Sequence, residues 1–120
     1  MKTPIFDEKD GIKEHECLLM YDNSYEFYAE VLKAFYKESL ETARKMEKTL
    51  SESQYDDYRI LVHGLKGLGG AIGDDKLLDL ATSSNALLKS GNITEGISYH
   101  KALIDELKRI QELIKERVLD

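Results

Sequence analysis

The 120-residue chain has no tryptophan, one proline and one cysteine. The single Cys17 excludes a disulfide within the chain and argues against a metal site built on thiolates. No apolar run approaches the roughly 20 residues that a membrane-spanning helix needs. No apolar signal-peptide segment follows Met1 either, so nothing in the sequence directs export. We therefore expect a cytoplasmic protein that has no membrane partner.

Negative charge is in excess, because 23 acidic residues face 17 lysines and arginines and give a net charge of -6. This balance argues against nucleic acid as a partner. Abundant Leu, Glu, Lys and Ala favour helices over a sheet. No repeat, low-complexity tract or long linker divides the chain. We therefore expect residues 1–120 to form one domain with its core at about residues 8–118.

Apolar residues recur at helical spacing along most of the sequence. Helices are expected over residues 6–21 (weakened by Gly11), 25–50, 55–72 and 74–90, and from about residue 92 nearly to the C-terminus. The segment Asp22-Asn23-Ser24 is predicted to offer a cap for the second helix, and Ser53 and Asn92 are predicted to cap the third and the last. Because short connections favour antiparallel neighbours, we expect an all-α fold. Its architecture would be an antiparallel up-and-down four-helix bundle with an additional short N-terminal helix.

The third of these helices carries a histidine on the side away from its apolar stripe. At about 100° per residue, the expected core stripe spans roughly 60° and consists of Leu61, Leu65, Leu68 and Ile72. His63 projects about 180° from it, into solvent. The neighbours of His63 on this face, one or two turns away, are Arg59, Lys66, Gly67 and Gly70.

Glycine is frequent on this helix, although each glycine costs about 1 kcal/mol relative to alanine in a helix interior. The four helical glycines are Gly64, Gly67, Gly69 and Gly70. A surface cleared of side chains lets a partner's active site close over the imidazole. Such a function would explain why the helix keeps glycines that lower its stability. Histidine is an accepted covalent nucleophile, and Lys66 can offer positive charge to phosphoryl oxygens. The pattern therefore favours phosphoryl transfer.

The segment His63-Gly64-Leu65-Lys66-Gly67, followed by Ile72-Gly73, resembles the histidine-containing phosphotransfer (HPt) domain. The pattern of that family is a histidine, a lysine three residues on, a glycine four on, and a glycine ten on after an aliphatic residue. The resemblance covers about residues 8–115. This chain departs from the family at Leu68 and Asp74, where small residues are usual, and at Ser84-Asn85, where Leu-Glu is usual.

The resemblance implies a four-helix bundle and a phosphocarrier that is not an enzyme and has no ATP site. His63 would be the phosphorylated nucleophile, with Lys66 as charge partner and a docking surface of Arg59, Gly64, Gly67 and Gly70. The partners implied are a response-regulator receiver domain, a hybrid sensor histidine kinase, or both. The chain would bind no cofactor or metal, because Mg²⁺ is expected in the receiver. We expect a monomer, either free-standing or part of a larger kinase.

Three other readings follow from the same residues. A bundle of this type can instead serve as an interaction module that binds a receiver or kinase without transferring phosphate, although the retained His63 and Lys66 count against it. A di-iron bundle needs Glu-x-x-His pairs, but isoleucine stands three residues before each histidine, including His15 and His100, which we expect at the surface. A dinucleotide-binding loop is excluded because no strand precedes the glycines.

Overall fold

The structure is a computed structural model that describes residues 4–120 of the chain. These residues are helical apart from their connections, and their only β-type pairing is an isolated bridge between Ile12 and Asp74. The expected all-α class is therefore confirmed. The elements are the 3₁₀ turn η1 (Glu8–Asp10), α1 (Glu14–Met20), α2 (Tyr25–Ser51), α3 (Tyr55–Ile72), α4 (Asp75–Lys89), α5 (Ile93–Ile97), α6 (His100–Ile114) and one π-helical turn (Lys115–Leu119).

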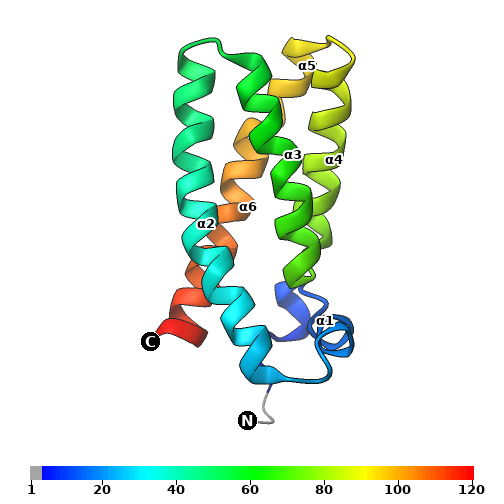
Figure 1. Ribbon diagram of the computed structural model, residues 1–120, viewed down its shortest axis with the longest axis vertical. Coiled ribbons are helices and arrows are strands. Elements are labelled where there is room, and N and C mark those ends of the chain that lie inside the picture. Colours follow the sequence, from blue (N-terminus) through cyan, green and yellow to red (C-terminus); the bar gives the residue numbers. More distant parts are fainter. Residues whose placement is uncertain (1–3) are drawn as a thin grey trace.

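The four long helices lie along the long axis of the molecule, and successive ones run in opposite directions (Figure 1). Helix α3 packs against α2 and α4, and α6 packs against the same two helices. The largest fully buried side chains lie between these helices and include Tyr28, Phe35, Tyr58, Leu77 and Leu107. Across residues 4–120, every helix is either too short or too polar to cross a lipid bilayer.

The expected bounds of α2, α3 and α4 agree with the structure, because local signals end these helices. Ser24 caps α2, and its side chain accepts the N–H of Phe27 at 3.0 Å. Helix α3 ends at Gly73, which adopts a left-handed φ of 86°. Directly after it, the side chain of Asp74 caps α4 by accepting the N–H of Leu77 at 3.2 Å. The α3–α4 corner is therefore tight.

The expected first helix over residues 6–21 is wrong in extent. Gly11 has a left-handed φ of 73° and ends the turn η1, so that α1 begins only at Glu14. Between them the N–H of Lys13 donates to the carbonyl of Gly73 at 2.9 Å. That tertiary hydrogen bond takes the place of a helical one. The N-terminal segment is therefore fastened to the end of α3 and does not continue a helix.

The expected last helix is divided into α5 and α6, with Ser98 and Tyr99 between them. Gly96 packs closely on α4, since a Cβ there would lie 2.6 Å from the Leu88 side chain. Two of the predicted caps are also wrong. Ser53 adopts a left-handed φ of 55° and makes no cap hydrogen bond, and the side chain of Asn92 does not cap α5.

Candidate functional site

Helix α3 buries one stripe and exposes the side that carries His63. The buried stripe consists of Tyr58, Val62, Leu65, Gly69 and Ile72. Leu65 and Ile72 were expected there, whereas Leu61 and Leu68 are only half-buried at its edges. The side chain of His63 lies about 140° around the helix from the centre of this stripe and is exposed. The expected orientation of His63 is therefore confirmed, with a slightly rotated core stripe.

The exposed side of α3 is cationic and partly apolar around His63. Arg59 and Lys66 are half-buried at its margin, one turn on either side of His63. No aspartate or glutamate occurs from residue 58 to residue 73, although the whole chain is acidic. Ile60, one turn before His63, is 59% exposed. We term this surface, from Arg59 to Gly70, the His63 face.

Three of the four helical glycines serve no packing purpose within the fold. A Cβ added at Gly64, Gly67 or Gly70 would meet no atom of residues 4–120 within 4 Å. Gly69 differs, since its Cβ would lie 3.1 Å from the N of Leu78 and 3.2 Å from the O of Asp74. Helix α4 therefore needs Gly69 for its close approach. Counting Gly69 among the glycines that clear the face was wrong, whereas the other three leave the surface bare.

This difference predicts opposite effects of one substitution at two neighbouring glycines. Gly67→Ala should raise the free energy of unfolding by about 1 kcal/mol, because alanine is the better helix former and has open space. Gly69→Ala should lower it by about 1 kcal/mol or more, because the added methyl group crowds the backbone of α4. Urea denaturation of both variants measures the two values. Equal effects would contradict the distinction between the two positions.

A groove of about 450 Å³ runs between α2 and α3 beside this surface. Ile60 lines the groove and also belongs to the His63 face, so the two are continuous. The α2 wall supplies three cations, Arg44, Lys45 and Lys48. Sequence reasoning missed Ile60 and the groove. The helical wheel could have found Ile60, since an isoleucine about 110° from the centre of the expected core stripe lies outside that stripe.

The other two histidines lie in different settings. His15 is exposed on α1, as expected. His100 is half-buried, and the expectation that it lies at the surface is wrong. Its Nδ1 lies 2.8 Å from the hydroxyl of Tyr58 and its Nε2 lies 3.1 Å from the carboxylate of Glu47. By contrast, no hydrogen bond or ion pair within residues 4–120 involves the ring of His63, which leaves its nitrogens free.

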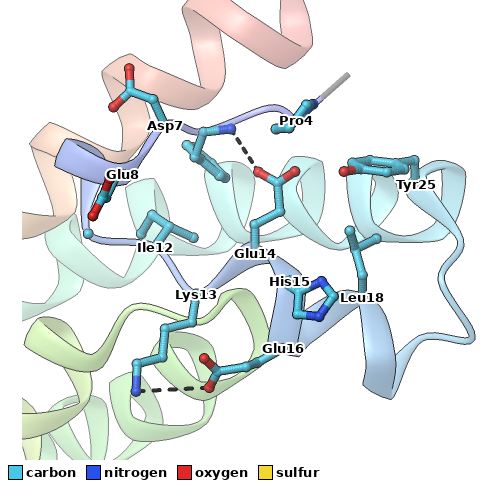
Figure 2. Close-up of a pocket in the computed structure, with 12 residues that line it drawn as sticks. Pro4, Asp7, Glu8, Ile12, Lys13, Glu14, His15, Glu16, Leu18 and Tyr25 are labelled. Atoms are coloured by element: carbon cyan, nitrogen blue, oxygen red, sulfur yellow. Dashed lines mark hydrogen bonds and ion pairs between the residues drawn. The ribbon is translucent and has the colours of Figure 1, made fainter. Parts of the chain in front are cut away.

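A hollow of about 550 Å³ lies at the N-terminal end and is lined by the segment around α1 (Figure 2). Its central acid, Glu14, accepts the N–H groups of Ile5 and Phe6 at 3.0 and 2.7 Å. Lys13 forms an ion pair with Asp75 at 2.7 Å. Because these polar groups already have partners in the chain, this hollow is explained by the anchoring of the N-terminal segment. The His63 face is the stronger candidate for a functional site.

Sequence relatives offer no independent guide to this site. Comparison of the chain with protein-family models, with curated proteins and with solved structures found no match. The function has therefore to be inferred from the residues of the His63 face and their geometry.

Proposed function

We propose that the chain is a histidine phosphotransfer protein of a two-component phosphorelay. It carries a phosphoryl group on His63 between receiver-domain aspartates, or from a histidine kinase to a response regulator. Helices α2, α3, α4 and α6 then form the antiparallel four-helix bundle of an HPt domain, with α1 as the added N-terminal helix. The observation that supports this proposal best is an exposed imidazole, free of hydrogen bonds within residues 4–120, beside three bare glycine positions on a helix with no carboxylate from residue 58 to residue 73.

The chemistry needs only one nucleophile from this chain. A lone pair on an imidazole nitrogen of His63 attacks the phosphorus of an aspartyl phosphate in the receiver. A P–N bond forms while the P–O bond to the aspartate breaks, and the aspartate leaves as a carboxylate. The other ring nitrogen keeps its hydrogen, so the ring gains a positive charge beside a dianionic phosphoryl group. Lys66 and Arg59 add positive charge nearby, and the Mg²⁺ expected in the receiver belongs to the partner.

Docking of the receiver explains the remaining features of the face. Gly64, Gly67 and Gly70 leave room for a partner surface to approach the imidazole. Ile60 offers an apolar contact at the edge of the groove. The acidic active site of a receiver would meet a helix that has no carboxylate between residues 58 and 73. We further propose that the chain acts in the cytoplasm as a monomer.

Transfer from a phosphorylated receiver tests this proposal. The purified chain is incubated with a panel of receiver domains labelled with ³²P, and the label on each protein is followed over time. We expect label on this chain that survives alkali and is lost in acid, as phosphohistidine is. Binding of a receiver without any transfer of label would instead favour an interaction module. The proposal would be overturned if the chain neither bound nor accepted label from any receiver or histidine kinase.

A further inference from the structure

Asp74 is buried at the corner between α3 and α4, with none of its surface exposed. Its Oδ1 accepts the N–H of Leu77, and its carbonyl accepts the N–H of Leu78 at 3.1 Å. Its Oδ2 is also buried, yet within residues 4–120 no donor group reaches that oxygen. A buried carboxylate oxygen without a donor is costly. The ionised form of Asp74 is therefore poorly accommodated here.

A second carboxyl group, that of Glu106 on α6, lies within hydrogen-bonding reach of Asp74. The side chain of Glu106 is only 1% exposed. Both of its oxygens accept from the guanidinium of Arg109, at 2.9 and 2.8 Å. Glu106 is thus held as a carboxylate, and its oxygens can also accept a hydrogen bond from a protonated carboxyl group. Two carboxylates in contact inside a protein cannot both ionise without a large penalty.

Among the residues that the structure describes, the charges around the pair do not supply a second full counter-ion. Arg109 serves Glu106 and also donates to the carbonyl of Asp10 at 2.8 Å. Lys76 reaches Glu106 only at 4.0 Å from an exposed position. The other charged groups that face the corner already form ion pairs, Asp10 with Arg117 and Lys13 with Asp75. The remaining titratable group, the thiol of Cys17 beside Gly73, is uncharged. One proton between Asp74 and Glu106 would satisfy both acids.

We propose that Asp74 and Glu106 share one proton, held on Asp74 Oδ2 and donated to Glu106, and that loss of this proton loosens the α3–α4 corner. The proton would give Oδ2 a hydrogen bond and remove the repulsion between the two carboxylates. Its loss places two negative charges against one guanidinium. This inference concerns the pH dependence of the α3–α4 corner and does not depend on phosphotransfer.

The direction of the pKa shifts agrees with the geometry. Burial, together with the hydrogen bond and charge of Glu106, raises the pKa of Asp74 to about 7. For Glu106, burial raises the pKa, but the hydrogen bonds of Arg109 and Asp74 lower it overall. An aspartate in an unfolded chain ionises with a pKa near 3.9. The stability that the shared proton contributes is therefore lost between about pH 4 and pH 7 and stays level above that range.

The corner also fastens the N-terminal segment, so its loosening has consequences beyond α4. The N–H of Lys13 donates to the carbonyl of Gly73, and Ile12 pairs with Asp74 in the isolated bridge. Arg109 holds the carbonyl of Asp10 in the same region. When Asp74 ionises, the N-terminal segment and the end of α3 should open more readily. Amide protection of Lys13 and Leu78 should then fall between about pH 4 and pH 7 and level off above that range.

Asp74→Asn tests the shared proton, because its side chain has the same shape, keeps an acceptor for Leu77 and donates to Glu106 without titrating. The equilibrium constant for unfolding is measured for wild type and variant from pH 5 to pH 8. The ratio of the wild-type constant to that of the variant should rise by up to tenfold per pH unit between pH 5 and pH 7 and then level off. Asp75→Asn, at an exposed neighbour, should leave the corresponding ratio nearly constant.

A second measurement needs no variant and covers the case in which Asp74→Asn does not fold. Side-chain carboxyl ¹³C resonances of the wild-type protein are followed as a function of pH, with Asp74 assigned through its backbone. We expect Asp74 to titrate between pH 6 and pH 8. An Asp74 resonance that titrates fully below pH 5, or a constant ratio for the folded variant, would overturn the proposal.

Discussion

His63→Gln is expected to abolish phosphoryl acceptance while leaving the helical fold unchanged. Glutamine matches histidine in polarity and approximate size, but its amide nitrogen has no available lone pair and cannot attack phosphorus. His63 is exposed, and its ring has no hydrogen-bond partner within residues 4–120. A surface substitution of this kind changes stability by roughly 0.5 kcal/mol or less. Loss of transfer with an unchanged circular dichroism spectrum and unfolding midpoint is the predicted result.

The assay is the transfer of ³²P from a labelled receiver domain to the chain. His15→Gln serves as the matched control, because His15 is also exposed but lies on α1. We expect that control to accept label at the wild-type rate. His100 is unsuitable as a control since its ring bonds to Tyr58 and Glu47. Label that persists on the His63→Gln protein would show that another residue carries the phosphoryl group.

Gly67→Glu should block transfer and leave stability equal to or higher than that of wild type. The position lies one turn after His63, with open space above it. A glutamate there would place a bulky negative charge against the acidic active site of a receiver, and like charges across an interface cost several kcal/mol. Transfer should therefore slow by about a hundredfold or more, since each 1.4 kcal/mol is a factor of ten. Glutamate is also a better helix former than glycine, by roughly 0.5–1 kcal/mol.

Two variants separate docking from general effects of charge and shape. Gly67→Ala adds a methyl group without charge and should keep most of the transfer rate. Ala102→Glu adds the same side chain and charge at an exposed position on α6, a helix that packs against α2 and α4. It should transfer at the wild-type rate. If Gly67→Glu transferred as fast as either control, clearance for a docking partner would no longer explain the glycines.

The central helices could be predicted because their limits depend on neighbours in sequence. The start of α2 follows from Ser24, whose side chain bonds to an amide three residues on. The end of α3 follows from Gly73, which adopts a left-handed φ. The two ends of the chain were predicted less well. There the backbone of Lys13 bonds to Gly73, and Gly96 packs on Leu88, and neither partner is close in sequence.

Some features of the candidate site could likewise be predicted from the sequence, and others could not. The exposure of His63 follows from helical periodicity, and so do the bare positions Gly64, Gly67 and Gly70. Gly69 carries the same residue type on the same helix, yet it is buried, because α4 approaches it at the corner. A count of glycines cannot distinguish these positions. The groove beside Ile60 likewise exists only because α2 and α3 lie together.

The sequence by itself determined the helical class, the limits of α2, α3 and α4 and the direction in which His63 points. These properties repeat every three to four residues along a helix and need no knowledge of other elements. The tertiary structure alone decided which polar groups are buried together. In the sequence, Asp74 is only one of two acidic residues at the start of an expected helix, and α6 brings Glu106 and Arg109 against it in the structure. His100 likewise reads as a surface histidine until packing places it between Tyr58 and Glu47, because burial and the pairing of charges depend on residues far apart in the chain.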